Sequence, residues 1–154
     1  MSSRPWRADR LARRLRTRMT QGRISPEKVL KEVEDPSAGG IVVFVGTIRS
    51  RSEFGRVDGL EYQAYWKMAQ KRMNAIGAEV MRRWPVKKVS MYHREGKLKI
   101  GEVSVVVAVS SEHRAEAFEA CRYAINKIKT GLPLWKRERV RGTHRWVEGK
   151  PIRN

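Results

Sequence analysis

The chain has 154 residues, a length at which one domain can bury its own core without the help of metals or disulfides. Hydrophobic residues make up 40% and charged residues 32%, and no run approaches the roughly 18 consecutive apolar residues of a membrane span, so we expect no membrane insertion. The one cysteine, Cys121, has no partner for an internal disulfide, and no His/Cys cluster has the spacing of a metal site. We therefore expect a reducing, cytoplasmic setting and no bound metal.

The charge of the chain is its most unusual property. Lys and Arg number 34 against 16 Asp and Glu, a formal net charge of +18 that should attract phosphates, nucleic acid or acidic protein surfaces. Seven arginines and one aspartate lie within residues 1–18, which we predict to be a basic, flexible arm in front of a domain spanning 19–154. Leu11, Leu15 and Met19 are spaced for one helical face, so the arm could be helical when bound. A transit peptide, or an extension ahead of a true start at Met19, stay open as alternatives.

Turn and cap residues divide the first part of the domain. Ser25-Pro26-Glu27 predicts the start of a short helix that runs to about Val33. The apolar, β-branched run from 41 to 45 predicts a buried, central strand. Residues 50–59 are polar and contain two glycines, which predicts a mobile loop before a second strand at about 60–64.

Helical and extended patterns alternate in the second part. Apolar residues at steps of three and four predict a long amphipathic helix over 67–83, and strands are predicted at 86–92 and 103–109 with a turn region at 96–101 between them. This order indicates an α/β or α+β sandwich. A third helix is predicted after the last strand, with its apolar stripe at Phe118, Cys121, Ile125, Ile128 and Leu132.

The start of this third helix carries His113 and Arg114. A helix dipole favours negative groups at that end, so a cation there needs an explanation. With the free backbone N–H groups, the two side chains could form a phosphate or carboxylate site. An exposed arginine beside a satisfied histidine is the alternative.

Lys129 and Lys136 flank the end of the same helix, and we place Lys136 in the loop that follows. Leu132 to Trp135 are too apolar for a solvated tail, so Lys136 is expected beside packed surface, where a partly desolvated lysine near other cations can act as a base or nucleophile. Ordinary solvated charges are the alternative. Arg49 follows the apolar strand run, at a strand end of the kind that ligands favour in α/β sheets, although a plain surface arginine is equally compatible.

The remaining candidates are assigned structural roles. Cys121 lies on the apolar stripe of the third helix and is expected in the core. His93 and His144 have no partner spacing that indicates a metal site.

A series of motifs follows along the chain. The motifs are G-G-I-V-V-F-V-G-T-I-R from Gly39, L-E-Y-Q-A-Y-W-K-M-A from Leu60, R-W-P before Val86, H-R-E-G at His93, S-S-E-H-R-A-E-A-F-E-A from Ser110, K-T-G-L-P-L-W-K-R-E from Lys129 and R-W-V-E from Arg145. They cover roughly residues 20–148, in order and without large gaps, and their series is specific although each motif alone is weak. Together they resemble the large, catalytic subunit of the molybdopterin synthase family.

The resemblance implies a fold, a reaction and partners. The fold is an α/β hammerhead core with an additional antiparallel β subdomain, which forms a homodimer with one small subunit at each end. The reaction transfers sulfur from the C-terminal thiocarboxylate of that small ubiquitin-like subunit onto a cyclic pyranopterin monophosphate, twice, without any cofactor. The resemblance makes Lys129 and Lys136 catalytic, and it assigns Arg49, His113, Arg114 and Arg145 to substrate binding.

Two rival functions belong to other classes. The charge and twelve aromatic residues are compatible with a nucleic-acid-binding module, but the sequence has no RNP-type motif, zinc-finger spacing or G-x-x-G clamp. An inactive scaffold that only binds the small subunit is opposed by the presence of both Lys129 and Lys136.

Overall fold

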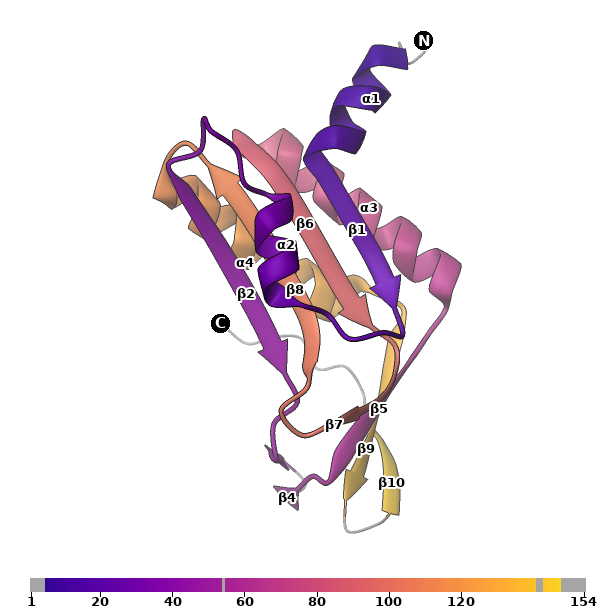
Figure 1. The fold of residues 1–154 in the computed structure, drawn as a ribbon. Coiled ribbons are helices and arrows are strands. Elements are labelled where there is room, and N and C mark those ends of the chain that lie inside the picture. The colour runs from indigo at the N-terminus through magenta and orange to yellow at the C-terminus, as the bar shows by residue number, and fades with distance from the viewer. Residues whose placement is uncertain (1–4, 54, 141–142, 148–154) are drawn as a thin grey trace.

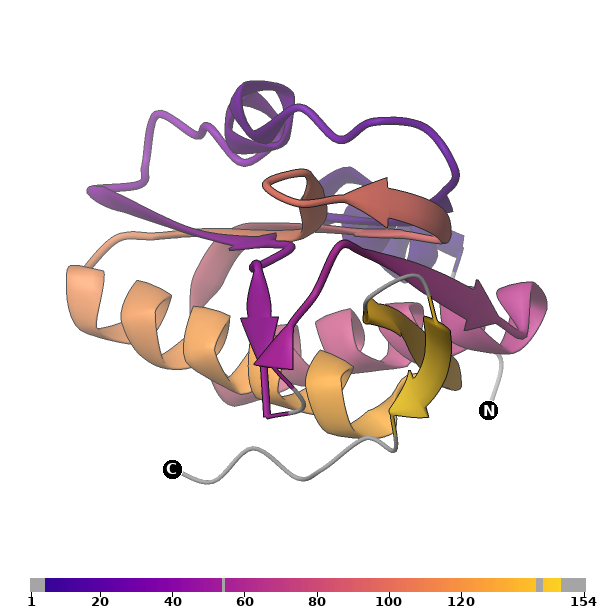
Figure 2. The same cartoon turned by 90° about the horizontal axis from the view of Figure 1, so that it is seen from below.

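The centre of the molecule is a four-stranded sheet in the order β1-β6-β8-β2, seen in a computed structural model that describes residues 5–53, 55–140 and 143–147. Helices α3 and α4 cover one face of this sheet and the short helix α2 lies on the other (Figure 2). The strands are β1 (Leu15–Thr20), β2 (Gly40–Thr47), β6 (Val86–Arg94) and β8 (Val103–Ser111), and the helices are α2 (Pro26–Glu32), α3 (Trp66–Arg83) and α4 (Arg114–Gly131).

The two long helices confirm the helical periodicity of the sequence. Helix α3 buries Ala69, Met73, Ile76 and Val80 against the sheet, and α4 buries Cys121, Ile125 and Ile128 in the same core. The predicted stripe of α4 is wrong at Phe118, which is 62% exposed, because the alanines of the helix face the sheet there instead. The short helix α2 starts as predicted, since the Ser25 side chain accepts a hydrogen bond from the Lys28 amide.

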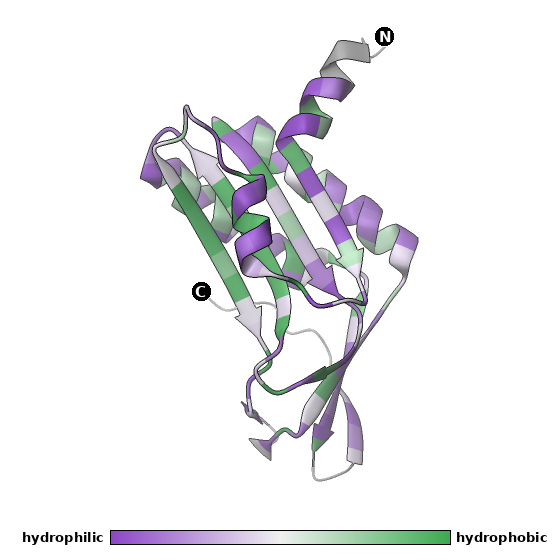
Figure 3. Ribbon diagram, in the orientation of Figure 1, coloured by the Kyte–Doolittle hydropathy of each residue, from purple (hydrophilic) through white to green (hydrophobic). Residues whose placement is uncertain are grey.

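Strand β2 does not lie at the centre of the sheet, and this prediction was wrong. It pairs with β8 along one side and forms an edge of the sheet among the described residues. Ile41, Phe44 and Val45 keep between 37% and 39% of their surface exposed. Figure 3 shows β2 as a largely hydrophobic strand at the outer edge of the main sheet. The central strands are β6 and β8, and burial on both faces accounts for the long apolar run of β8.

The N-terminal region also differs from expectation. Helix α1 (Pro5–Arg14) ends where β1 begins, so Leu11, Leu15 and Met19 do not share one helical face. Strand β1 runs parallel to β6, which buries Met19 and brings Leu15 against Gly77 of α3. Residues 15–18, assigned to the arm from sequence, are therefore part of the sheet.

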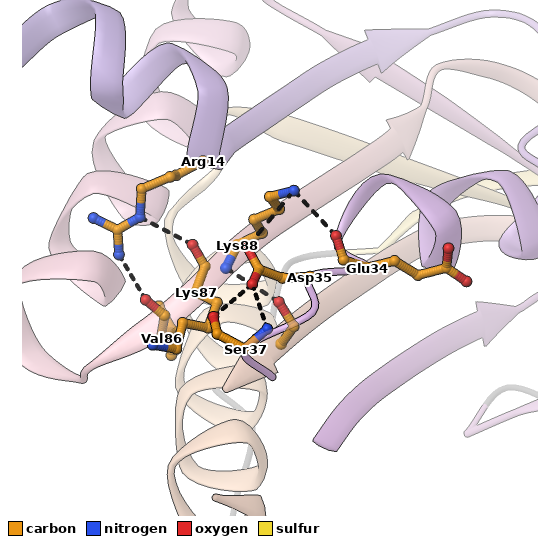
Figure 4. A network of polar contacts seen from close by, with 8 residues as sticks. Arg14, Glu34, Asp35, Ser37, Val86, Lys87 and Lys88 are labelled. Atoms are coloured by element: carbon orange, nitrogen blue, oxygen red, sulfur yellow. Dashed lines mark hydrogen bonds and ion pairs between the residues drawn. The ribbon is translucent and has the colours of Figure 1, made fainter. Parts of the chain in front are cut away.

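Arg14 connects the end of α1 to the main sheet. Its guanidinium donates hydrogen bonds to the backbone carbonyls of Val86, at 2.6 Å, and Lys87, at 2.9 Å. Beside it, Lys88 donates to the carbonyl of Glu34 and forms an ion pair with Asp35 (Figure 4). The first residues of β6 are thus tied both to α1 and to the segment after α2.

A second, antiparallel sheet lies beyond one end of the main sheet (Figure 1). Its order is β10-β9-β5-β7, and a small hairpin of β3 and β4 lies beside it. The turn region predicted at 96–101 contains a strand, because the backbone of β7 pairs with β5. This second sheet is the antiparallel β subdomain expected from the family resemblance. Its strands are β5 (Gly59–Ala64), β7 (Gly96–Lys99), β9 (Leu134–Val140) and β10 (Thr143–Val147), and the hairpin strands are β3 (Arg51–Ser52) and β4 (Gly55–Arg56).

Candidate active site

A cavity of about 800 Å³ lies between the main sheet, the end of α4 and the second sheet. Its walls come from the end of β2 and the segment after it, from the last turns of α4, and from alternate residues of β5 and β9. Three residues selected from the sequence, Arg49, Lys129 and Lys136, line this one cavity. The fold thus brings together cations that lie up to 87 positions apart in the chain.

Lys129 belongs to the last turn of α4, which fixes its backbone. Water reaches the side chain through the cavity, but the surrounding walls remove enough solvent to lower the pKa of the amine. Desolvation is the largest cause of this lowering, followed by the charges of Lys136 and Arg49. The amine is thereby prepared to lose its proton closer to neutral pH than an ordinary lysine does.

Lys136 lies in strand β9, not in a loop as predicted. The alternation of a β-strand sends Leu134, Lys136 and Glu138 to the cavity, whereas Trp135 points away and is 47% exposed. The Lys136 ammonium lies 3.6 Å from a carboxylate oxygen of Glu138. This ion pair places the lysine on one wall of the cavity.

Glu138 is a buried carboxylate that the sequence did not single out. The residue is 3% exposed, and its Oε2 atom has no hydrogen-bond partner in the part of the chain that the structure describes. Tyr62 of β5 lines the same wall, and its pKa is raised first by burial and also by the negative charge of Glu138. The Glu138 carboxylate therefore has one oxygen without a described hydrogen-bond partner in a cavity that Lys129, Lys136 and Arg49 also line.

Arg145 lies in β10 directly opposite Glu138 of β9. Directly opposed residues of an antiparallel pair project to the same face of the sheet. Because Glu138 and Val147 line the cavity, Arg145 shares the cavity side of this sheet, although it is exposed and lies outside the lining itself.

His113 and Arg114 lie at the opposite end of α4 from Lys129. The helix between Arg114 and Lys129 is about 22 Å long, which separates the two groups within one chain. Both side chains are exposed, and His113 lies 3.8 Å from the carboxylate of Glu112. Arg114 packs beside Gly40, where a Cβ would come 3.7 Å from its Cα atom. These two predicted substrate ligands are thus next to the start of edge strand β2, while the cavity is at its end.

His93, which was assigned a structural role from the sequence, also belongs to the cavity. It is 1% exposed and lines the cavity from β6. Burial lowers its pKa to about 4, with the charge of Lys129 as a smaller cause and a hydrogen bond to the Arg94 carbonyl acting in the opposite direction. Only its position in the H-R-E-G motif gave a signal, whereas Glu138 could have been found from the alternation of the segment that follows Pro133.

Cys121 lies in the core, as its place on the apolar stripe of α4 predicted. Cys121 is buried, and burial raises the pKa of its thiol to about 11, so it is not a reactive thiolate at neutral pH. Within the described residues, no group of His, Cys, Asp and Glu side chains is arranged to hold a metal ion. None of the described helices is both long and apolar enough to cross a membrane.

The known proteins compared below, which are similar to this chain in sequence or structure, are molybdopterin synthases or their catalytic subunits. The family model described as MoaE protein matches residues 19–131. The molybdopterin synthase catalytic subunit of Halalkalibacterium halodurans is 44% identical over 121 residues, covering 79% of this chain and 78% of that protein. The human protein of the same name is 38% identical over 131 residues, covering 85% and 70%. The crystal structure of molybdopterin synthase from Staphylococcus aureus matches with a TM-score of 0.80 at 35% identity, covering 84% of this chain and 95% of that one.

Proposed function

The chain belongs to the MoaE family, and on this premise we propose that it is the catalytic subunit of a molybdopterin synthase that acts through the cavity of Lys129 and Lys136. The observation that carries the site is the convergence of both lysines and Arg49 on one cavity. Sulfur passes from the thiocarboxylate of a small ubiquitin-like subunit to a cyclic pyranopterin monophosphate. In each transfer the acyl carbon–sulfur bond breaks and water supplies the oxygen that replaces the sulfur, so an ordinary carboxylate remains on the small subunit. Two transfers make the dithiolene.

The two lysines have different surroundings, which supports different roles. Lys129 is partly desolvated by the cavity walls and lies near two other cations, so its neutral amine is accessible for proton transfer or for attack on the acyl carbon. Lys136 is held by the Glu138 carboxylate at 3.6 Å, which suits a fixed positive charge that stabilises negative charge on the acyl group during transfer.

The substrate is an anion, and the cations around the cavity fit it. Arg49 lines the cavity at the end of β2, and Arg145 lies on the same side of the second sheet. A guanidinium can donate two parallel hydrogen bonds to a phosphate or thiocarboxylate, which fixes orientation as well as position. We assign both arginines to binding of the substrate.

We further propose that His113 and Arg114 act in the cavity of a second copy of the chain, in a homodimer formed along β2. Among the described residues, strand β2 is an apolar edge of the main sheet, and such edges are normally covered. Two β2 strands that pair antiparallel about a two-fold axis bring the start of each beside the end of the other. The eight residues of β2 span about 25 Å, close to the length of α4 that separates Arg114 from Lys129.

This arrangement completes each site from two chains. Arg114 of the partner subunit then reaches the cavity that contains Arg49 and Lys129. With one small subunit at each end, the assembly is a heterotetramer.

The single Cys121, which needs no disulfide partner, is compatible with a cytoplasmic location. The nucleic-acid-binding alternative receives no support from the comparisons.

Reconstitution tests this function. The purified chain is mixed with a thiocarboxylated small subunit and the cyclic phosphorylated pterin, and the dithiolene product is measured by mass spectrometry after alkylation of its sulfurs. We expect product with the thiocarboxylate and none with the same small subunit carrying an ordinary carboxylate. Absence of product from a complex that forms normally on a sizing column would reject the proposal.

A further inference from the structure

His93 lies in the cavity wall with its ring held by two contacts. Its Nδ1 atom lies 2.8 Å from the carbonyl oxygen of Arg94, which can only accept, so Nδ1 carries the proton. The ring of Tyr62 packs against the imidazole edge to face, with centroids 5.0 Å apart. Two contacts therefore fix the ring, and the nitrogen left for the cavity is Nε2 with its lone pair.

Charged groups from α4, from β9 and from the segment after β2 line the same cavity as the imidazole. Lys129 comes from α4, Lys136 and Glu138 from β9, and Arg49 from the segment after β2, and all four line the same cavity. Burial and the Lys129 charge hold the pKa of His93 at about 4, so the ring is neutral at physiological pH. A neutral ring can accept a hydrogen bond without adding charge to the cavity.

In the structure the described side chains of His93 and Lys129 line one cavity without a direct hydrogen bond between them. We propose that His93 is a positioning residue for Lys129, whose amine turns during the reaction to donate a hydrogen bond to Nε2 of the imidazole and is thereby held with its lone pair toward the substrate. The inference rests on the proposed role of Lys129. A carboxylate in the place of His93 would favour an ammonium, whereas a neutral acceptor can hold a neutral amine. Lys136, by contrast, has the Glu138 carboxylate 3.6 Å from its Nζ atom. A neutral imidazole for Lys129 and a carboxylate for Lys136 therefore support different roles for the two lysines.

Two substitutions distinguish positioning from packing. In His93→Asn the side-chain amide can replace Nδ1 and keep the bond to the Arg94 carbonyl, but nothing replaces Nε2. In His93→Gln the longer side chain returns an acceptor oxygen close to the place of Nε2. His144→Asn is the matched control, because His144 is exposed on β10 and does not line the cavity.

The measurements are kcat and KM with thiocarboxylated small subunit, the melting temperature, and the rate at which a small acylating reagent labels Lys129 relative to Lys136 across pH. We expect His93→Asn to lower kcat on the order of 100-fold at every pH, since misplacing a reacting group by about 1 Å costs that much. KM should stay near that of the unmodified protein, labelling of Lys129 should fall relative to Lys136, and His93→Gln should recover part of both losses.

Two results would overturn the inference. One is a normal kcat in His93→Asn while Lys129→Ala is inactive, which leaves the proposed function intact. The other is a loss in both His93 variants that follows the melting temperature, with unchanged labelling of Lys129 in the folded fraction, which means that His93 only packs. An active Lys129→Ala would instead contradict the role of Lys129 in the proposed function and remove the basis for a positioning residue.

Discussion

Lys129 and Lys136 come from a helix and a strand, yet the charge of Lys136 is one of the causes that lower the pKa of Lys129. The connection between them explains this proximity. Helix α4 ends at Gly131, Pro133 prevents its continuation, and the chain turns directly into β9 at Leu134. Both amines consequently reach one cavity from neighbouring walls.

Replacement of Lys129 by alanine should abolish sulfur transfer. The lysine is a small part of any broad protein interface, so small-subunit binding and dimer size should stay close to normal. Lys129→Arg should not restore activity, because a guanidinium keeps its proton and cannot act as base or nucleophile. Single-turnover product formation, measured with a sizing run of each complex, checks this, and near-normal rates in either variant would make Lys129 a simple helix-end charge.

The pH dependence of transfer should change when Lys136 loses its charge. In the proposed mechanism the neutral amine of Lys129 is the active form, so the rate should rise as pH increases through its lowered pKa. Removing a nearby positive charge favours the ammonium, so Lys136→Met should raise the pKa of Lys129 and move the rising limb to higher pH. Lys127→Met, at a lysine of α4 that lies over the Tyr123 ring, is the control and should leave the limb in place. Rate-against-pH profiles at saturating substrate decide between these outcomes, and an unshifted limb in Lys136→Met contradicts the coupling.

Mixed dimers should reveal whether each site is shared. Arg114→Ala should weaken substrate binding but change stability by no more than about 0.5 kcal/mol, because the side chain is exposed. If Arg114 serves the partner's cavity, mixing inactive Lys129→Ala with Arg114→Ala creates dimers with one intact site, and activity returns. If both residues serve the same chain, every site in the mixture stays defective and activity does not recover. The assay is product formation after subunits exchange, and Phe44→Asp on the edge strand should abolish both the dimer and the recovery.

Two truncations should separate α1 from β1. Removal of residues 1–14 should leave sulfur transfer unchanged, because the described side chains of α1 are exposed. Removal of 1–18 also deletes most of β1 and exposes the surface around Gly77 that Leu15 covers, which should cost at least about 1 kcal/mol of stability. Thermal unfolding of both truncations provides the comparison, with Leu15→Ala and the exposed Leu11→Ala as matched point variants. Equal melting temperatures for the two truncations would mean that β1 contributes nothing.

The features that the sequence predicted correctly are those that depend on residues close together in the chain. The three- and four-residue steps of α3 and the Ser25 cap of α2 depend on contacts within a few residues, so periodicity and capping rules found them. Lys129 and Lys136 could be identified as candidates from the sequence, because they lie close together in one short segment and the motif of that segment resembles that of a known family. Arg49 was found from its place after an apolar strand run.

Position within the sheet was decided only by tertiary structure. An apolar run such as residues 41–45 has the same hydropathy pattern in a central strand and in an edge strand. Hydropathy indicates that side chains are buried, but it does not indicate which element buries them. Strand β9 was missed because its partner β5 lies about 75 residues earlier and supplies the pairing for polar residues such as Arg137 and Arg139. His93 carries no local sign of its environment, since its burial, its fixed ring and its place beside Lys129 arise from strands and a helix that meet only in the folded chain.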